Sequence, residues 1–537
     1  MASFIRLAKC RRRCGCQPRS NPFLTAPASI LPARSNQYNH KVPYVISLDE
    51  GTTSARAALY NERGERIAMH SIPFDCYYPH PGWVEQDAVA IWRAQIEAAH
   101  QVVQIAQIKP DKIVACGITN QRETTVVWNR HTGEPVAPAI VWQCRRTADF
   151  CAELAASRHS RLIEEKTGLV IDAYFSGSKI RWILENIPGA RAKAQNGDLL
   201  FGNIDTWLIW NLTGGRSHVT DPTNASRTML MDLATGEWDD ELLSIFDIPR
   251  SMLPRIAPSS GRVGAIESNY LGAEIPISGI AGDQQAALAG QACFRAGLSK
   301  NTYGTGCFAL THAGGHQPRS THRLLGTRAA AAGASTAQFA VEGSVFIGGA
   351  VIQWVRDSLG LIGTAAESEG VAQSVANSGG VYLVPAFVGL GAPHWDSGAR
   401  GLISGLTRNS GKAHIVRAAL ESIAFQSREL IDAMEADSGE NITELRVDGG
   451  AAVNDFLMQF QADILGKTVV RPADVETTAL GAAFLAGIAE HVWSSTDEVE
   501  SFWRVERRFE PRMAEAERDL LMNGWKEAVS RARSALQ

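Results

Sequence analysis

The chain has 537 residues, of which 45% are hydrophobic and 20% charged, and its formal net charge is −4. This length exceeds what one hydrophobic core supports, so we expect two or more domains. The balanced charge offers no basic face for nucleic acid, and no segment reaches the ~18 uncharged apolar residues of a membrane-spanning helix. We therefore expect a soluble protein with no nucleic acid partner and no membrane span.

The nine cysteines are an odd number and include no Cys-x-x-Cys pair. This usage favours reduced, buried thiols in a cytoplasmic protein. The first forty residues, by contrast, hold six arginines, and no acidic residue precedes Asp49. Such a composition is typical of an organellar transit peptide, although a disordered extension or a start codon assigned in error also explains it. We predict a disordered or targeting extension over 1–42, with a mitochondrial location as the alternative to the cytoplasm.

The chain after this extension opens with a predicted β-meander. A buried strand ends in the carboxylate of Asp49, a Gly51-Thr52-Thr53 turn follows, and Asn61-Glu62-Arg63-Gly64 closes a hairpin. Hydrophobic periodicity then alternates between helix and strand, as in an α/β domain. The predicted elements are strands over 44–49, 55–60, 65–74 and 113–119 and a helix over 88–105.

The second half of the chain repeats this theme around Gly304-Thr305-Gly306. This turn also lies between two predicted strands, which indicates a duplicated architecture with the ligand between the halves. The further predicted elements are strands over 299–303 and 307–312, a strand with a double-glycine turn over 446–450, and helices over 454–465 and 478–488. We predict domains over 43–293 and 299–490, then a helical tail over 491–537 with a solvated helix from Arg507 onward.

The segment Asp49-Glu50-Gly51-Thr52-Thr53-Ser54-Ala55-Arg56 combines the groups that a nucleotide phosphate needs. Asp49 at a strand end can hold Mg²⁺, directly or through water, and Thr52, Thr53 and Ser54 offer hydroxyls and N–H groups to phosphate oxygens. Arg56 adds positive charge. An ordinary β-turn explains the bare Asp-x-Gly-Thr pattern as well. The second hairpin, with Thr305, favours phosphate binding, because two such loops are hard to explain structurally.

The acceptor side of a transfer reaction is indicated by two other segments. Thr119-Asn120-Gln121-Arg122-Glu123-Thr124-Thr125 places donors and an acceptor side by side for a small polyhydroxylated molecule, although Arg122 and Glu123 could also form a surface ion pair. In Gly282-Asp283-Gln284-Gln285, Asp283 can act as a general base toward an alcohol. Its alternative role is the N-cap of a helix from Gln284 to Cys293, and the two roles are compatible.

These segments, with Ile140-Val141-Trp142-Gln143-Cys144-Arg145-Arg146-Thr147, resemble the FGGY carbohydrate kinase family of the actin-like ATPases, from about Tyr44 to Arg512. The resemblance implies an α/β fold of two actin-like (ribonuclease H-like) domains, with the active site in the cleft between them. It implies ATP-dependent, Mg²⁺-assisted phosphorylation of glycerol to sn-glycerol 3-phosphate by a homodimer or homotetramer. The alternatives are a kinase of the same family for another small polyol or ketose, or a non-catalytic actin-like nucleotide-binding protein.

The resemblance also assigns roles to individual residues. The N-terminal domain would bind polyol and phosphate, and the C-terminal domain would bind the nucleoside. The residues assigned to the substrate are Arg122, Glu123, Trp142, Tyr174, Asp283, Gln284 and Phe308, with Asp283 as the catalytic base. The residues assigned to ATP are Thr52, Thr53, Ser54, Arg56, Thr305, Gly349, Gln353, Gly450 and Asn454, with Asp49 at the metal. Core packing remains the alternative for the aromatic residues, and a surface helix position remains the alternative for Gln353.

Two features depart from the family pattern. Position 50 is Glu where the family usually carries Gln, so an extra negative charge lies beside Asp49 and the phosphate-binding turn. The second departure is the segment 267–274, which holds one glycine, two carboxylates and no Arg or Lys.

The second departure predicts that fructose 1,6-bisphosphate will not inhibit this protein. Some bacterial members of the family bind this inhibitor at the corresponding loop, with consecutive glycines and an arginine, which suit phosphate groups. Here the carboxylates of Glu267 and Glu274 would repel the anion. An activity assay at rising inhibitor concentration should give a flat rate. Saturable inhibition at low millimolar concentration, abolished by changes in this loop, would contradict the prediction.

Overall fold

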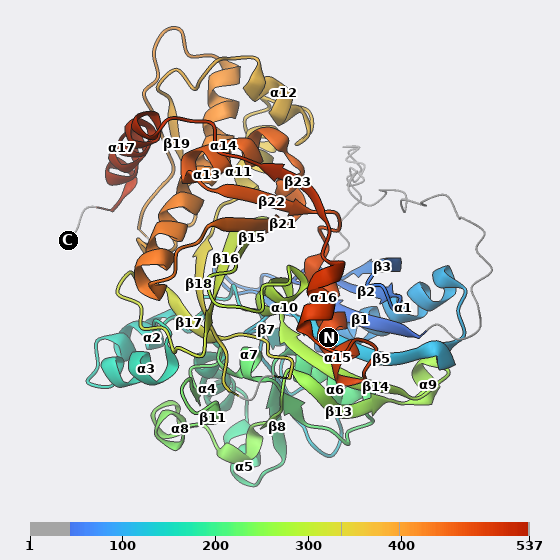
Figure 1. The fold of residues 1–537 in the computed structure, drawn as a ribbon. Helices are drawn as coiled ribbons and strands as arrows, with labels where there is room; N and C mark the ends of the chain where they lie inside the picture. The colour runs from blue at the N-terminus through green and yellow to red at the C-terminus, as the bar shows by residue number, and fades with distance from the viewer. Residues whose placement is uncertain (1–42, 334–335, 397, 535–537) are drawn as a thin grey trace, which may run out of the picture. The chain divides into compact units, whose positions relative to one another are not determined.

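Two mixed β-sheets organise the chain (Figure 1). The computed structural model describes residues 43–333, 336–396 and 398–534. The predicted extension over 1–42 lies outside these residues. Pro43 to Gln537 forms one compact unit, so both sheets belong to the same unit.

The N-terminal sheet has the strand order β13-β14-β5-β1-β2-β3. Strand β1 runs parallel to β5, and β5 runs parallel to β14, whereas β1, β2 and β3 form an antiparallel meander. The meander and its glycine turn therefore confirm the predicted arrangement. The strands are β1 (Tyr44–Glu50), β2 (Ser54–Tyr60), β3 (Arg66–Pro73), β5 (Ile113–Asn120), β13 (Ser260–Ile266) and β14 (Ile275–Gly282).

The C-terminal sheet repeats this pattern in the order β17-β18-β16-β15-β21-β22-β23. Strand β15 runs parallel to β21, and β21 runs parallel to β22, while β15, β16, β18 and β17 pair antiparallel. The duplication expected from the two glycine turns is thus present. The strands are β15 (Ser299–Tyr303), β16 (Cys307–Gly314), β17 (Leu325–Arg328), β18 (Phe339–Val345), β21 (Glu444–Asp448), β22 (Thr468–Pro472) and β23 (Val505–Phe509).

Helices α10 (Asp283–Gly290) and α15 (Thr477–Ala489) pack against each other, and α15 also covers β5, β14 and β1 (Figure 1). Small residues make this close approach possible. A Cβ on Gly481 would lie 1.8 Å from the carbonyl oxygen of Ala286, and one on Gly117 would lie 2.1 Å from that of Ala482. Since no side chain fits at either position, the Ala/Gly-rich sequence of α15 explains how a helix of the C-terminal half packs on the N-terminal sheet.

The other elements surround these two sheets. In the N-terminal half they are β4 (Glu85–Gln86), α1 (Ala88–Ala106), β6 (Val126–Asn129), β7 (Ala139–Ile140), α2 (Ala148–Ala155), α3 (Ser160–Thr167), α4 (Ser176–Asn186), α5 (Ala190–Gln195), β8 (Leu199–Gly202), α6 (Ile204–Leu212), β9 (Val219–Thr220), α7 (Pro222–Ala225), β10 (Met231–Asp232), β11 (Glu237–Trp238), α8 (Asp240–Phe246), β12 (Arg255–Ile256) and α9 (Ser268–Leu271). In the C-terminal half they are α11 (Ala350–Asp357), α12 (Glu367–Gln373), β19 (Tyr382–Val384), β20 (Leu402–Ser404), α13 (Lys412–Ser438), α14 (Asp455–Leu465), α16 (Thr496–Phe502) and α17 (Glu515–Ala532).

The prediction of a helical tail with a solvated helix from Arg507 onward is wrong in two respects. Residues 505–509 form strand β23, which pairs antiparallel with β22 and extends the sheet. The sequence of this edge strand shows no alternation of apolar and polar residues, because only Phe509 of its five residues is buried. Helix α17 is also not solvated all round, since Trp525 is fully buried and packs in the core of the C-terminal half.

Two compositional expectations can be compared with the structure. The six cysteines in the described ranges are free thiols, and five of them are buried. Within the same ranges, no helix combines the length and the apolar character needed to cross a membrane.

Candidate functional site

The turn between β1 and β2 carries the first group of candidate phosphate ligands. The Gly51 N–H donates to the Ser54 carbonyl at 3.0 Å, which closes the turn and leaves the Thr53 side chain exposed. The Thr52 carbonyl accepts from Gln86 Nε2 at 2.6 Å, and its hydroxyl accepts from Trp142 Nε1 at 3.0 Å. The contact to Trp142 joins a candidate phosphate ligand directly to a candidate substrate ligand.

Asp49 lies at the end of β1, opposite Arg56 on β2. Burial raises the pKa of Asp49 to about 6, and Arg56, whose Nη1 lies 3.3 Å from the carboxylate, opposes this shift. Arg56 also donates to Glu476 at 2.6 Å, so a carboxylate of the C-terminal half contacts the hairpin predicted to bind phosphate. The charge of Arg56 is therefore shared between two carboxylates.

This donor set is compatible with Mg²⁺. The ion is usually held by one or two carboxylates together with water and phosphate oxygens, and not by a cage of side chains. Asp49 supplies such a carboxylate beside the glycine turn. No cluster of three or more His, Cys, Asp or Glu side chains able to hold a metal occurs within the described residues, so the nucleotide and water would supply the other ligands.

Glu50 departs from the family pattern, and its side chain is completely buried. Burial raises the pKa of Glu50 well above its usual range, and the hydrogen bond from Gln121 Nε2 to Oε2 at 3.2 Å opposes this shift. Its other oxygen, Oε1, has no hydrogen-bond partner among the described residues. Glu50 thus has the Gln121 amide beside it, and no lysine or arginine of the described ranges forms an ion pair with it.

We predict that Glu50→Gln will be tolerated or mildly activating. An amide at this position can accept the same hydrogen bond from Gln121, and it carries no charge beside Asp49 and the nucleotide phosphates. Steady-state kinetics should show an unchanged or lower KM for ATP, with kcat within a few-fold of the original. A strong loss of activity would instead show that the Glu50 carboxylate has become a metal ligand.

The second glycine hairpin, between β15 and β16, lies against the start of α11. The Gly349 N–H donates to the Gly304 carbonyl, and the Gly348 N–H donates to the Thr305 carbonyl, both at 2.8 Å. A Cβ on Gly349 would lie 2.7 Å from the Gly304 oxygen, so this approach requires glycine. The Thr305 side chain remains exposed, where a ligand could reach it.

The candidate nucleoside residues lie around this hairpin. A Cβ on Gly449, whose φ is +84°, would lie 2.7 Å from the Tyr303 carbonyl oxygen, while one on Gly450 would meet nothing within 4 Å. Asn454 is the N-cap of α14, where its side-chain oxygen accepts from the Leu457 N–H at 2.9 Å. Gln353 is exposed on α11. A helix cap alone accounts for Asn454, so its contact with a nucleoside remains a prediction.

Arg122 and Glu123 follow the end of β5 and are both buried, so they do not form a surface ion pair. Glu123 has a φ of +61°, a left-handed conformation that is uncommon outside glycine and concentrates at functional sites. Arg227 Nε donates to Glu123 Oε1 at 2.6 Å, and Arg122 donates to both oxygens of Glu342, at 2.5 and 2.9 Å. Two arginines and two glutamates thus form a buried network.

The charges of this network explain why the network can be buried. Burial disfavours a charge on Glu342, yet Arg122 and Arg227 outweigh it and lower the pKa of Glu342 to about 2. Burial raises the pKa of Glu123, and Arg227 and Arg122 oppose that shift. Because Glu342 lies on β18 of the C-terminal sheet, the network joins both halves of the chain.

Asp283 is the first residue of α10, and Gly282 takes the N-cap position. The predicted alternative, in which Asp283 caps a helix over 284–293, is therefore wrong. Asp283 lies inside the helix and not at its cap, and the helix ends at Gly290. Its Oδ1 accepts from the Gln284 N–H at 2.7 Å and lies 3.0 Å from Arg122 Nε. The Asp283 side chain is 32% exposed, whereas that of Arg122 is only 2% exposed. Asp283 is thus the most exposed carboxylate of this cluster.

The predicted aromatic residues divide between the two halves. The rings of Trp142 and Tyr174 lie 5.5 Å apart, and the Tyr174 ring lies 5.5 Å from the Arg227 guanidinium. Phe308 lies on β16 of the other sheet, where its carbonyl accepts from Lys300 Nζ at 3.2 Å. The structure therefore gathers Arg122, Glu123, Asp283 and Gln284 in one cluster, with Trp142 and Tyr174 beside it.

Four charged residues of the candidate site were missed from the sequence: Arg227, Lys300 and Glu342 at this cluster, and Glu476 beside Arg56. Glu342 offered the clearest indication, since it is the one charged residue in the buried strand Phe339–Val345. Lys300 similarly precedes the Gly-Thr-Gly turn in a buried strand. A single charge inside a buried strand must have a partner, which indicates a functional or structural ion pair.

The segment 267–274 contains α9 and remains acidic in character. Arg216, which is distant in sequence, donates to Glu267 at 2.5 Å, so an arginine does lie beside this segment. Its charge is already paired with a carboxylate, and the predicted absence of phosphate binding therefore stands as a prediction.

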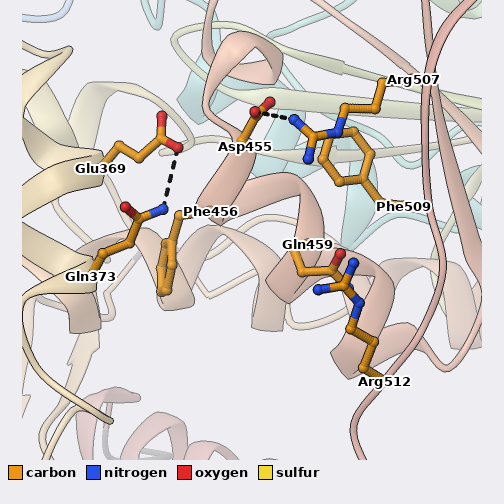
Figure 2. Close-up of a pocket in the computed structure, with 8 residues that line it drawn as sticks. All are labelled: Glu369, Gln373, Asp455, Phe456, Gln459, Arg507, Phe509 and Arg512. Atoms are coloured by element: carbon orange, nitrogen blue, oxygen red, sulfur yellow. Dashed lines mark hydrogen bonds and ion pairs between the residues drawn. The ribbon is translucent and has the colours of Figure 1, made fainter.

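A cavity of about 290 Å³ lies on the C-terminal half, between α12, α14 and β23 (Figure 2). Its lining residues are Glu369, Gln373, Asp455, Phe456, Gln459, Arg507, Phe509 and Arg512. None of the predicted site residues is among them. Ion pairs with Arg471 and Arg507 already satisfy Asp455, so we keep the candidate site at the two glycine hairpins and the Arg122 cluster.

The two duplicated α/β halves, each with a glycine hairpin, form the two-domain α/β fold of carbohydrate kinases. Residues 44–290 match the N-terminal domain, and residues 299–490 the C-terminal domain, of the FGGY family of carbohydrate kinases. The chain belongs to this family.

Individual relatives refine this comparison. The chain is 57% identical over 489 residues to glycerol kinase 2 of Thermotoga maritima, covering 91% of this chain and 98% of the relative. The structure of Plasmodium falciparum glycerol kinase with ADP superposes with a TM-score of 0.86 at 37% identity, covering 92% of this chain and 99% of that one. Ligand-bound xylulose kinase from Lactobacillus acidophilus has a TM-score of 0.81 at 24% identity, covering 91% and 97%. The last likeness shows the fold alone.

Proposed function

We propose that this protein transfers the γ-phosphoryl group of ATP to glycerol, giving sn-glycerol 3-phosphate and ADP. The observation that carries the proposal is the half-buried carboxylate of Asp283, held 3.0 Å from the buried Arg122 beside Glu123 and Gln284. The two glycerol kinases described above support glycerol as the acceptor. The proposal also includes the site roles predicted from the sequence.

The acceptor would be held by hydrogen bonds to each of its hydroxyls. A site built from placed polar groups rejects analogues that leave those groups unpaired. Arg122 and Gln284 supply N–H donors, and Glu123 and Asp283 supply acceptors. The rings of Trp142, Tyr174 and Phe308 would cover the carbon chain. The buried network of Arg227 and Glu342 keeps Arg122 and Glu123 fixed before the substrate binds.

Asp283 would act as the general base. As the glycerol oxygen forms its bond to the γ-phosphorus, the hydroxyl proton passes to the Asp283 carboxylate. The bond between the γ-phosphorus and the bridging oxygen of ADP breaks in the same transfer. Phosphoryl transfer depends mainly on positioning and on neutralising charge, and the N–H groups of the two glycine hairpins suit that task.

The donor nucleotide would lie between the hairpins. Thr52, Thr53, Ser54 and Arg56 would contact the phosphates from one side and Thr305 from the other, with the nucleoside near Gly349, Gln353, Gly450 and Asn454. Mg²⁺ held by Asp49 would neutralise phosphate charge when bound.

A substrate panel tests the proposal. ADP release, coupled to an NADH-consuming reaction, should be measured with glycerol, dihydroxyacetone, erythritol and xylulose. Glycerol should give the highest kcat/KM. A higher value for xylulose or erythritol would assign the protein to another acceptor within the family, and no ADP release with any of the four would favour a non-catalytic nucleotide-binding protein.

We predict that the N-terminal segment is dispensable for this chemistry. Its Pro, Ser, Asn and Arg content cannot form a core, and β1 begins only at Tyr44. A chain that starts at His40 should match the full-length kcat and KM, and a large loss would make the segment part of the fold.

Location in the cytoplasm and assembly as a homodimer or homotetramer also remain predictions. Import of a reporter fused to residues 1–42 into mitochondria would favour the transit peptide.

A further inference from the structure

Lys300 lies on β15, ahead of the second glycine hairpin, and its side chain is completely buried. A buried lysine is costly unless its three N–H groups have acceptors. Here Nζ donates to Gln284 Oε1 at 2.5 Å, to Thr302 Oγ1 at 2.9 Å and to the Phe308 carbonyl at 3.2 Å. The three acceptors of Lys300 are thus residues of the candidate site or of the second glycine hairpin beside it.

The contact with Lys300 fixes the orientation of the Gln284 side-chain amide. An ammonium group can only donate, so the Gln284 oxygen must face Lys300. The Gln284 Nε2 group is then directed to Asp283 Oδ2, which accepts at 3.2 Å. A chain of two hydrogen bonds therefore runs from the Lys300 ammonium through the Gln284 amide to the carboxylate of the candidate base.

The surroundings of Lys300 keep its charge despite burial. Burial lowers the pKa of Lys300 to about 8, and the carboxylates of Asp448, Asp283 and Glu342 oppose this shift, while Arg122 adds to it. At neutral pH the group is therefore mostly an ammonium, which is the form that the Gln284 contact requires. Lys300 also contacts both strands of the hairpin that carries Thr305, through Thr302 on β15 and Phe308 on β16.

We propose that Lys300 is a positioning residue for the acceptor: it holds the Gln284 amide so that its NH₂ group faces Asp283 and the glycerol hydroxyls. This inference rests on the proposed function and extends it to a residue that does not itself touch the substrate. Without the ammonium, the Gln284 amide is free to turn, and its oxygen then faces the Asp283 carboxylate unfavourably. The expected consequence is weaker and less productive acceptor binding with unchanged nucleotide binding.

A double-mutant cycle tests this role. Lys300→Met and Gln284→Ala should each lower kcat/KM for glycerol by about 10–100-fold, the range of one or two lost polar contacts. The double variant should be no worse than Gln284→Ala alone, because Lys300 acts through Gln284. The KM for ATP should stay within about threefold in all three variants. The unmodified protein, assayed in parallel, reports separately whether the proposed glycerol kinase activity exists.

Lys300→Arg and Thr302→Val serve as companion variants. Lys300→Arg keeps the cation and a donor, so it should retain more activity than Lys300→Met. Lys300→Gln, which removes the cation, replaces Lys300→Met in the cycle if the latter does not fold. Thr302→Val removes a different acceptor of Nζ but leaves the ammonium and its contact with Gln284 in place, so it should lower kcat/KM for glycerol less than Lys300→Met does. Fully additive losses from Lys300 and Gln284, or a change confined to the KM for ATP, would overturn the proposal.

Discussion

Asp283→Asn is expected to lower kcat by ~10²–10⁴-fold, the usual cost of removing a general base. The substitution keeps the shape of the side chain and its acceptor for the Gln284 N–H, which now lies at 2.7 Å from Oδ1. It removes the ability to take a proton, the charge opposite Arg122 and the second oxygen, which accepts from Gln284 Nε2. The fold and nucleotide binding should therefore survive, as an ADP-induced rise in the thermal midpoint would show.

Asp240→Asn provides the matched control for this experiment. Asp240 pairs with Arg250 at the surface, where its side chain is 84% exposed, far from the candidate site in the sequence. The control should keep the full rate. If Asp283→Asn retained more than about half of the original rate, the assignment of Asp283 as the base would be wrong.

Arg122→Gln is expected to affect both stability and acceptor binding. The substitution removes the cation that contacts both oxygens of Glu342 and lies 3.0 Å from Asp283. Glu342 is fully buried, and among the described residues it keeps only Arg227 as a charged hydrogen-bond partner. Breaking a buried ion pair from one side typically costs about 3–5 kcal/mol, so the thermal midpoint should fall and the glycerol KM should rise strongly.

Two further variants separate these effects. Arg161→Gln removes an exposed arginine from the helical ion pair with Glu165, and no measurable change in the midpoint is expected. Adding Glu342→Gln to Arg122→Gln should recover part of the lost stability, because the buried charge is no longer left behind. It should not recover the glycerol KM. An unchanged midpoint for Arg122→Gln would contradict the central position given to this network.

Sequence reasoning anticipated the parts of the fold that local patterns determine. The glycine turns at Gly51 and Gly304 and the periodicity around them were sufficient to predict both hairpins and the duplication. Helix α15 was predicted from its alanines and glycines. Its close packing against α10, which Gly481 allows, was not predicted. The pattern missed β23, because an exposed edge strand rich in charge shows no hydrophobic alternation.

The candidate site was predicted less completely, for a physical reason. Arg122, Glu123 and Asp283 stand in recognisable strings, so their roles could be proposed from the sequence. Arg227 and Glu342 act on them across more than one hundred residues, and no local pattern records such a distance. Lys300 is only 16 residues from Gln284, but the two residues lie on different elements, β15 and α10, and only the structure shows that the ammonium meets Gln284.

The central claim, transfer of phosphate from ATP to glycerol, is tested most directly by identifying the product. The purified protein should be incubated with ATP, Mg²⁺ and glycerol, with ADP and sn-glycerol 3-phosphate quantified in parallel, the latter with a stereospecific dehydrogenase. One sn-glycerol 3-phosphate should form for each ADP, and Asp283→Asn should lose both together. ADP release without sn-glycerol 3-phosphate would contradict the account.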